Sequence, residues 1–285
     1  MRVTRFAPSP TGPLHLGHAF SALTAAARAE DGDGVFLLRI EDIDRQRSKP
    51  EWEQRIYDDL RWLGLDWPAP VLRQSERLPA YRAALERLWA EGLLYPCGCN
   101  RRDILEAASA PQEGGPRFGP DGMIYPGTCR GGDRAGPMPE DTPLRLDLAR
   151  AVERIDGPLA WIETGEAPGP REVAPEALID TIGDPVLARR EMGTSYHLAV
   201  VIDDAHQNVT EVVRGRDLAE ATPLHVLLQR LMRLPVPDYH HHRLIRDETG
   251  RRLAKRDDAR AIGLYRDEGA SPAEIRRMVG LGAGR

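Results

Sequence analysis

Short apolar runs alternate with longer amphipathic segments along the first part of the chain. Val3–Ala7 and Val35–Ile40 are predicted to be strands, the second apolar enough to be buried on both faces. Between them, His18–Glu30 is rich in Ala and also contains Phe20 and Leu23, which predicts a packed helix ending near Gly32. A strand, a helix and a second strand in this order are typical of a parallel α/β sheet.

The same alternation continues beyond residue 50. A helix is predicted from Pro50, because Ile56, Leu60 and Leu63 fall on one face, and another is predicted over Pro79–Glu91. Further strands are predicted over Leu144–Leu148, Leu198–Ile202, Val209–Arg214 and Tyr239–Arg246. Further helices are predicted over Pro223–Arg233, Asp258–Asp267 and Pro272–Val279.

Residues 109–143 interrupt this pattern. They contain seven prolines and eight glycines, too many for regular core structure. The sequence therefore predicts a parallel α/β domain split by a loop-built insertion.

Composition narrows the class of protein. The 285 residues are 41% hydrophobic, enough for a sizeable core, and no apolar run approaches the length of a membrane helix. Three cysteines cannot form a disulfide scaffold, so a reducing cytoplasm is the expected location. The net charge of -5 argues against a domain that mainly coats nucleic acid, although a local basic surface is still possible.

His15-Leu16-Gly17-His18 lies between the first strand and the first helix. The two imidazoles can donate hydrogen bonds to anionic oxygens, and the helix N-terminus behind them adds aligned N–H groups. Two histidines at this spacing are more often structural. Their position after the first strand favours a ligand site, because open α/β sheets bind ligands at strand carboxyl ends.

A second basic element runs from Arg251 to Arg256 after a glycine turn. Such a tip is often only solvated surface. Lys255 stands out because the chain contains only one other lysine, Lys49. A compact ammonium on a flexible stem is suited to reaching a phosphate.

These two elements resemble the HIGH and KMSKS signatures of class I aminoacyl-tRNA synthetases. Motifs of the glutamyl-tRNA synthetase family are similar to three further segments of this chain: Arg5–Gly12, Arg39–Asp44 and Val213–Leu218. The resemblance implies a Rossmann-like parallel sheet split by an inserted zinc-binding module, with a short helical C-terminal segment. The corresponding division is 1–95 and 191–245 for the two catalytic halves, 96–190 for the module, and 246–285 for the signature loop and C-terminal helices.

Only 29 residues follow Arg256. A segment of this length is too short for the helical anticodon-binding region of a full glutamyl-tRNA synthetase. The chain therefore resembles a shortened branch of that family. The implied activity is ATP-dependent activation of L-glutamate without tRNA, followed by esterification of glutamate to the queuosine base in the anticodon of tRNA(Asp). A monomer is expected, with no membrane partner.

The resemblance also implies residue roles. Arg5, Ser9, Glu41, Tyr196 and Arg214 would form the glutamate pocket, with Glu41 taking the ammonium group. Arginine binds carboxylates bidentately, which suits a substrate with two of them.

In the implied mechanism the glutamate α-carboxylate attacks the α-phosphorus of ATP, and positioning and charge stabilisation supply the catalysis. His15, Gly17 and His18 would bind the adenylate side and Lys255 the departing phosphates, with Mg²⁺ bridging oxygens. Arg252 and Ala254 depart from the family pattern, since they replace a lysine and a serine. The lost hydroxyl could slow activation without abolishing it.

Cys97 and Cys99 lie shortly before the Gly/Pro-rich segment, and the third cysteine, Cys129, lies within it. Unpaired cysteines are usually buried small residues, but here they converge on a stretch with little core of its own. A structural Zn²⁺ normally takes four ligands. The resembled family suggests Tyr125 as the fourth, while Asp121 or a water is the alternative.

His240-His241-His242 does not predict a metal site, because neighbouring strand residues point to opposite faces. His241 is expected to be a pocket-wall or packing residue. The run from Arg251 to Arg260 could contact tRNA phosphates, although Asp257 and Asp258 reduce its charge.

Three alternatives stay open at this point. A compact glutamyl-tRNA synthetase would charge the tRNA 3′ end. A non-catalytic relative would bind only tRNA or glutamate, which the Ala254 departure favours. A small nucleotidyltransferase carrying the same histidine motif would not need the inserted module.

Overall fold

The structure is a computed structural model that describes residues 1–108, 118–120, 122–246 and 260–282. The elements of its first half are β1 (Val3–Phe6), α1 (Leu16–Asp31), β2 (Val35–Ile40), α2 (Pro50–Trp62), β3 (Leu72–Arg73), the 3-10 helix η1 (Gln74–Glu76), α3 (Leu78–Ala90) and β4 (Leu94–Pro96). The intervening segment contains α4 (Arg101–Ala108), β5 (Phe118–Gly119), β6 (Gly122–Met123), β7 (Leu144–Leu146), α5 (Leu148–Val152), β8 (Leu159–Glu163), β9 (Gly169–Val173), α6 (Ala177–Thr181) and β10 (Val186–Ala188). The last part contains α7 (Tyr196–His206), β11 (Glu211–Gly215), the 3-10 helix η2 (Arg216–Ala221), α8 (Thr222–Leu231), β12 (Asp238–His242), α9 (Ile262–Asp267) and α10 (Pro272–Met278).

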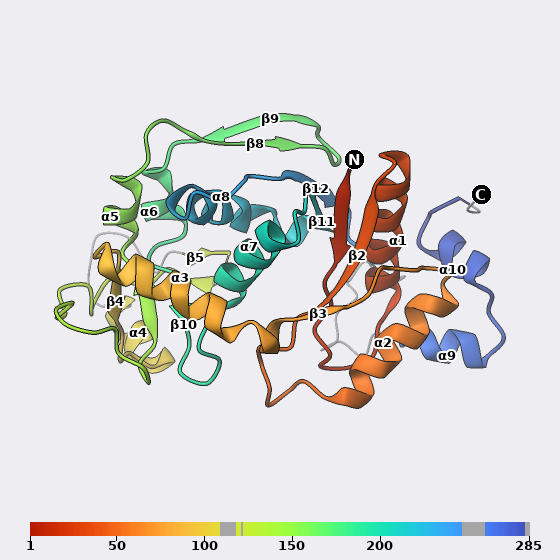
Figure 1. Cartoon of the computed structure of the whole chain (residues 1–285), viewed down its shortest axis with the longest axis horizontal. Coiled ribbons are helices and arrows are strands. Elements are labelled where there is room, and N and C mark those ends of the chain that lie inside the picture. The colour runs from red at the N-terminus through yellow and green to blue at the C-terminus, as the bar shows by residue number, and fades with distance from the viewer. Residues whose placement is uncertain (109–117, 121, 247–259, 283–285) are drawn as a thin grey trace.

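Parallel strands form the centre of the molecule. β2 pairs in parallel with β1 and β3, and β11 pairs in parallel with β12. The two groups meet where β1 lies beside β11, with mutual hydrogen bonds between Val3 and Thr210 (Figure 1). The predicted α/β class with a parallel sheet is therefore confirmed.

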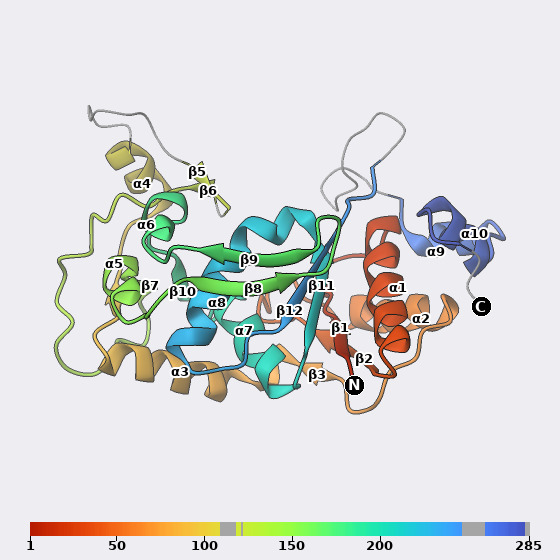
Figure 2. The ribbon, with the colours of Figure 1, turned by 90° about the horizontal axis from the view of Figure 1, so that it is seen from above.

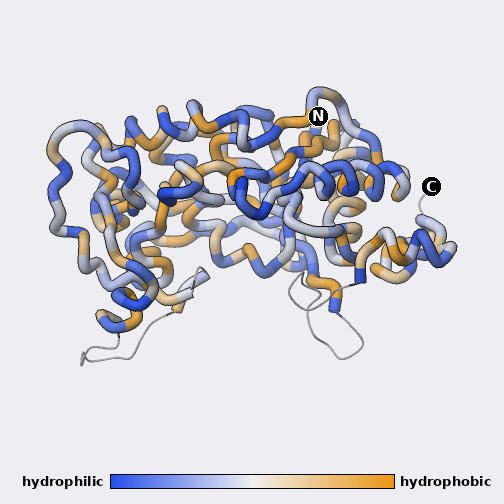
Figure 3. Tube along the Cα trace, turned by 90° about the horizontal axis from the view of Figure 1, so that it is seen from below, coloured by the Kyte–Doolittle hydropathy of each residue, from blue (hydrophilic) through white to orange (hydrophobic). Residues whose placement is uncertain are grey.

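Helices cover this sheet as the apolar periodicity predicts. α1 packs on β1 and β2, and its buried residues include several alanines, Phe20 and Leu23. Gly32 caps its C-terminal end, where the backbone N–H of Gly32 donates to two of the last carbonyl oxygens of the helix. α7 and α8 pack on each other, and α8 also packs on β8. In the hydropathy view the segments that cross the middle of the molecule carry most of the orange, while the outer loops are largely blue and white (Figure 3).

The segment between the two halves divides in space. β4, β7 and β10 form a small antiparallel sheet at one end of the molecule. The β8–β9 hairpin instead extends the sheet of β11 and β12, because Glu163 of β8 pairs with Tyr239 of β12 (Figure 2). The domain boundaries stay a prediction, but a hairpin from the predicted module joins the sheet of β11 and β12.

One predicted strand is wrong. Leu198–Ile202 lies inside helix α7, and the side chain of Ser195 caps that helix by accepting a hydrogen bond from the N–H of Leu198. A short run of β-branched apolar residues has the same pattern in a buried helix as in a buried strand. The cap at Ser195 and the buried Asp203 and Asp204 at the other end of the run were the signals that favoured a helix.

Two apolar cores support the sheet. One gathers β1, β2, α1 and α2 together with Ile262 and Ile275 of the C-terminal helices. The other joins α3, the small antiparallel sheet, α7 and α8. Among the described residues, no helix is both long and apolar enough to cross a membrane.

Candidate active site

A cavity of about 320 Å³ opens where the central parallel strands end. Residues from four of these strands or the loops directly after them reach it, as expected for a ligand site of an open α/β sheet. The predicted site residues in its lining are Arg5, His15, Gly17, His18, Glu41, Tyr196 and Arg214. Ser9, also predicted to bind substrate, lies in the loop after β1 but is not in the lining.

Arg5 enters the cavity from β1 with its guanidinium held by the protein. Its Nε and Nη2 donate to the two carboxylate oxygens of Asp204, at 2.9 and 3.4 Å, and its Nη1 donates to the carbonyl of Val213 at 3.1 Å. A bidentate ion pair of this kind fixes the plane of the guanidinium. Arg5 therefore presents an oriented positive charge rather than a mobile one.

Glu41, directly after β2, is buried beside two cations. Arg39, which is fully buried, donates from Nη2 to Glu41 Oε1 at 3.1 Å and from Nη1 to Asp204 Oδ1 at 2.7 Å. Burial raises the pKa of Glu41 even though Arg39 and Arg5 act against this. An ammonium group entering the cavity would favour the charged form, which matches the role predicted for Glu41.

Arg214, on β11, is 5% exposed and hydrogen-bonded on three sides. Its Nε donates to His241 Nε2 at 3.2 Å, its Nη1 to His225 Nδ1 at 2.9 Å, and its Nη2 to Thr222 Oγ1 at 2.8 Å. Burial and the neighbouring Arg214 charge hold the pKa of His225 well below its usual range, so this ring stays neutral and can accept.

Tyr196 begins helix α7 and lines the cavity. Burial raises the pKa of its phenol, despite the opposing charge of Arg214. The phenol is therefore protonated at neutral pH and can donate a hydrogen bond to a carboxylate.

His15 and His18 form a reciprocal cap at the start of α1. His15 Nδ1 accepts from the N–H of Gly17 at 3.1 Å, and His18 Nδ1 accepts from the N–H of His15 at 3.1 Å. Because both Nδ1 atoms are acceptors, each neutral ring carries its proton on Nε2. The rings lie 3.8 Å apart in the cavity wall, so two N–H donors belong to one end of the site.

Gly17 is required by the packing of His15. A Cβ at this position would lie 3.0 Å from Cε1 of His15 and 3.1 Å from its Nδ1. The group that approaches Gly17 closely is therefore the capping imidazole of His15.

Lys255, Arg252 and Ala254 lie outside the described residues, as do most of the basic residues predicted to contact tRNA. The described residues on either side of this segment lie at the cavity. Ile245 lines it, and Ala261 forms a β-bridge with His15.

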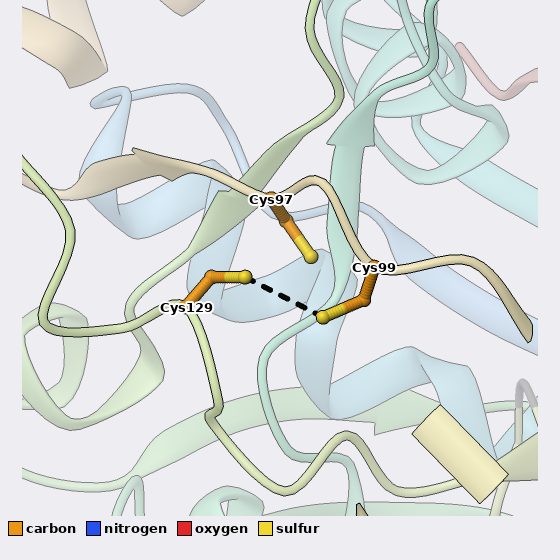
Figure 4. A group of neighbouring side chains, drawn as sticks. All are labelled: Cys97, Cys99 and Cys129. Atoms are coloured by element: carbon orange, nitrogen blue, oxygen red, sulfur yellow. Dashed lines mark hydrogen bonds between the residues drawn. The ribbon is translucent and has the colours of Figure 1, made fainter. Parts of the chain in front are cut away.

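The three cysteines come together in the small antiparallel end of the molecule. Cys97 and Cys99 point from one loop toward Cys129 on another (Figure 4), and their sulfur atoms lie within 4.8 Å of one another. In the part of the chain that the structure describes, this is the one group of three or more His, Cys, Asp or Glu side chains with metal-ligand spacing.

Tyr125 adds a fourth donor atom to this cluster. Its hydroxyl lies 3.5 Å from Cys97 Sγ and 3.4 Å from Cys99 Sγ, and it accepts from the N–H of Cys129 at 2.8 Å. Around tetrahedral Zn²⁺, sulfur and oxygen ligands lie about 3.6 Å apart. The four donors therefore fit one zinc ion. Asp121, the alternative donor, lies outside the described residues.

Arg145 provides positive charge next to the cluster. Its Nε donates to Cys97 Sγ at 3.2 Å, and its guanidinium carbon lies 3.8 Å from the centre of the Tyr125 ring. Burial alone would raise the pKa of Cys129, but hydrogen bonds from Tyr125 and Cys99 lower it to about 7. The lowered pKa favours the thiolate form of Cys129, which is the form that metals bind, whereas burial raises the pKa of Cys99 and of the Tyr125 phenol.

Sequence reasoning missed Arg39, Asp204, Thr222 and His225. Arg39 was detectable, because it lies two residues before Glu41 and strand alternation puts both on one side. The other three carried no local signal, since each meets its partner across more than one element. His241 was predicted to be a pocket-wall or packing residue, and its hydrogen bond to Arg214 was not foreseen.

The fold and cavity define a class I synthetase catalytic domain, and a family model agrees. The model described as tRNA synthetases class I (E and Q), catalytic domain, matches residues 2–117 and 172–283. The chain belongs to this family.

Two relatives share the name Glutamyl-Q tRNA(Asp) synthetase. The one from Rhodobacter capsulatus is 63% identical over 282 residues, covering 98% of this chain and 100% of the relative. The one from Nocardia farcinica is 43% identical over 278 residues, covering 96% of this chain and 82% of the relative.

Solved structures show the same fold in longer chains. A glutamate-tRNA synthetase from Elizabethkingia anophelis matches with a TM-score of 0.74 and 27% identity over 98% of this chain. A glutamate tRNA ligase from Elizabethkingia meningosepticum, in complex with its amino acid, matches with a TM-score of 0.73 and 28% identity over the same share. This chain spans only 61% and 60% of their lengths.

Proposed function

We propose that this protein activates L-glutamate with ATP in the absence of tRNA and then transfers the glutamyl group to the queuosine base in the anticodon of tRNA(Asp). The observation that carries the proposal is the 63% identity, across the full length, to a relative named Glutamyl-Q tRNA(Asp) synthetase. The cavity supports it chemically, because it combines the cations Arg5 and Arg214 with the carboxylate of Glu41.

In the first step an oxygen of the glutamate α-carboxylate attacks the α-phosphorus of ATP, and pyrophosphate leaves. Glutamate has two carboxylates and one ammonium group. The carboxylates would be bound by Arg5, Arg214 and the phenol of Tyr196. The ammonium group would be bound by Glu41. The Nε2–H groups of His15 and His18 would donate to the oxygens of the reacting phosphate, where negative charge builds up. Mg²⁺ bound together with ATP would neutralise part of the negative charge on the phosphates.

In the second step a hydroxyl of the queuosine base attacks the carbonyl carbon of the glutamyl adenylate. An ester bond forms, the acyl–phosphate bond breaks, and AMP leaves with the electron pair. The protein does not need to form a covalent intermediate, so its contribution is positioning and electrostatic stabilisation.

Glutamate-dependent ATP–pyrophosphate exchange without tRNA tests the first step. Exchange is expected with the wild-type protein, and its absence at high enzyme concentration would favour a protein that only binds tRNA or glutamate. Lys255→Ala should slow the exchange strongly if Lys255 binds the departing phosphates. Lys49→Ala is the matched control, because Lys49 is the other lysine of the chain and its side chain is 57% exposed.

Mapping of the labelled product tests the second step. After reaction with labelled glutamate, nuclease digestion of tRNA(Asp) should leave the label on the anticodon fragment that carries queuosine, released by mild alkali as an ester. Label on the terminal adenosine would identify a compact glutamyl-tRNA synthetase instead.

We further propose that Cys97, Cys99, Cys129 and Tyr125 hold one structural Zn²⁺. The convergence of three thiols and one hydroxyl supports this, and the ion would tie two loops that share only a small apolar cluster. Metal analysis should find one zinc per chain, and a value well below one contradicts the proposal. The monomeric state and cytoplasmic location predicted from the sequence stay predictions.

A further inference from the structure

The guanidinium of Arg214 is oriented by a histidine whose own orientation has a visible cause. Arginine can only donate, so His241 Nε2 must accept the hydrogen bond from Arg214 Nε. The proton of the neutral ring then lies on Nδ1. That N–H points at Glu163 Oε2, 2.6 Å away.

Glu163 is itself held firmly at the end of β8. Its Oε1 accepts from the backbone N–H of His241 at 3.0 Å and from the N–H of Gly165 at 2.8 Å, and the residue is 8% exposed. Glycine at position 165 allows the backbone to come this close to His241, because a Cβ on residue 165 would lie 2.4 Å from the carbonyl oxygen of His241.

The other contacts of His241 agree with this tautomer. Thr222 Oγ1 accepts from Arg214 Nη2 and lies 3.1 Å from His241 Nε2, where its hydroxyl can donate to the same acceptor atom. The His241 ring also stacks on Tyr239 with an interplanar angle of 6°. The hydrogen bonds with Arg214 and Glu163 therefore assign the proton to Nδ1, and the contact with Thr222 is compatible with this.

We propose that Glu163 is a positioning residue for amino-acid recognition, which acts through His241 to hold the Arg214 guanidinium in the orientation that binds the glutamate carboxylate. The inference rests on the proposed function, in which Arg214 belongs to the glutamate pocket. Glu163 lies between residues 117 and 172, in the part of the chain that the family model leaves unmatched. A hairpin from the intervening segment thereby sets the specificity of a cavity built by the catalytic sheet.

We call the chain of hydrogen bonds from Glu163 through His241 to Arg214 the relay. It depends on which nitrogen of His241 carries the proton and does not need a charged histidine. Burial and the charge of Arg214 lower the pKa of His241 to about 4, so the ring is neutral at working pH. Burial alone would raise the pKa of Glu163, but hydrogen bonds from the backbone and side chain of His241 lower it. The carboxylate is therefore ionised and acts purely as an acceptor.

The test is Glu163→Gln, which keeps the shape of the side chain. The amide oxygen can still accept from the two backbone N–H groups, and its NH₂ group then faces His241 Nδ1. To accept from this NH₂ group, the His241 ring must carry its proton on Nε2 instead of Nδ1. Nε2–H would then face the Nε–H of Arg214, and the hydrogen bond between these two atoms would be lost. The expected result is a rise of about tenfold or more in the KM for glutamate, with the KM for ATP unchanged, in the exchange assay.

Glu211→Gln is the matched control. Glu211 is a buried carboxylate on β11 of the same sheet, but its partners include Arg28 and Thr164 rather than groups in the cavity lining. It should lower stability and leave the KM for glutamate unchanged. Equal KM values for wild type and Glu163→Gln overturn the relay, and so does an equal rise in both variants.

A spectroscopic measurement on the wild-type protein is independent of how the variants fold. Nitrogen-15 NMR of labelled histidine should show His241 protonated on Nδ1 and not on Nε2. A wild-type His241 protonated on Nε2 overturns the inference. Failure of wild-type exchange with glutamate would contradict the proposed function instead, so the two outcomes are distinguishable.

Discussion

Neutral histidines make many of the hydrogen bonds around the cavity, and the nitrogen that carries the proton decides what each ring can bind. His15 and His18 use Nδ1 to cap α1, which leaves Nε2–H as the donor of each ring. His225 and His241 instead accept from Arg214. Histidine thus has two uses in this site. In the proposed function His15 and His18 donate to the phosphate of ATP, whereas His225 and His241 accept from Arg214.

Gly17→Ala tests the placement of the donors at the phosphate end. The new Cβ would lie 3.0 Å from His15 Cε1, so the imidazole must shift by a few tenths of an ångström. We expect the rate of adenylate formation to fall about tenfold, equal to about 1.4 kcal/mol in the barrier. Pyrophosphate exchange at saturating substrates measures this rate.

The control for this prediction is Gly263→Ala in α9, where the added Cβ would meet only an ordinary contact at 3.7 Å. Its exchange rate should equal that of the wild type. Circular dichroism should show that both variants keep the native helix content. A Gly17→Ala enzyme as fast as the control would mean that the position of His15 does not limit the reaction.

At the scale of elements, apolar periodicity predicted most strands and helices, and local chemistry predicted several of their ends. Val35–Ile40 is a strand with the predicted bounds, and the helix predicted from Pro50 begins there. The run Leu198–Ile202 was misassigned because an apolar pattern of five residues has no distinguishable period. The pairing of β8 with β12 could not be predicted either, because strand pairing between distant segments leaves no local signal.

Tyr125→Phe tests the metal site in the antiparallel sheet region. The substitution removes the hydroxyl that faces the sulfurs and keeps the ring that packs under Arg145. We expect affinity for zinc to fall by about tenfold or more, measured by competition with a chelator. Tyr95→Phe is the control, because the hydroxyl of Tyr95 bonds Asp184 instead of the cluster, and its zinc affinity should be unchanged.

Asp59 on α2 gives the contact with α9 a pH dependence. It lies 3.3 Å from Arg266, and burial raises its pKa to about 6 although Arg266 and Arg55 oppose this. The folded state therefore holds this proton more tightly than the unfolded chain, whose aspartates titrate near pH 3.9. Its contribution to the free energy of unfolding is present below about pH 4 and is lost as the pH rises through about 6.

Asp59→Asn removes this dependence. Urea unfolding at pH 4 to 7 should show that the stability of the wild type relative to the variant falls by up to about 3 kcal/mol as the pH rises. A constant difference across this range would show that the carboxyl titrates normally.

At the scale of the whole molecule, one buried carboxylate links the first two strands to helix α7. Asp204 of α7 accepts from Arg5 of β1 and from Arg39 of β2, and all three side chains are nearly or fully buried. The motif positions Arg5, Glu41 and Arg214 could be predicted from the sequence, because they stand in segments that resemble motifs of the glutamyl-tRNA synthetase family. Asp204 could not, because its role depends on how the second half docks on the first.

Asp204→Asn should weaken both the docking and the site. Removing the shared charge leaves the buried guanidinium of Arg5 without its ion pair and that of Arg39 with Glu41 alone. Breaking a buried ion pair typically costs about 3–5 kcal/mol in unfolding free energy. The carboxylate also orients Arg5 in the cavity, so the KM for glutamate should rise together with the loss of stability. Urea unfolding and the exchange assay measure the two effects.

Asp203→Asn separates these effects, because Asp203 is equally buried but bonds Gln74, Arg77 and Tyr81 at the start of α3. It should lower stability to a similar degree, since Arg77 loses its partner, yet leave the KM for glutamate unchanged. If both variants raised that KM equally, general loosening of the fold would explain the result. A rise confined to Asp204→Asn means that the residue joining the two halves also holds the cation with which the first half binds substrate.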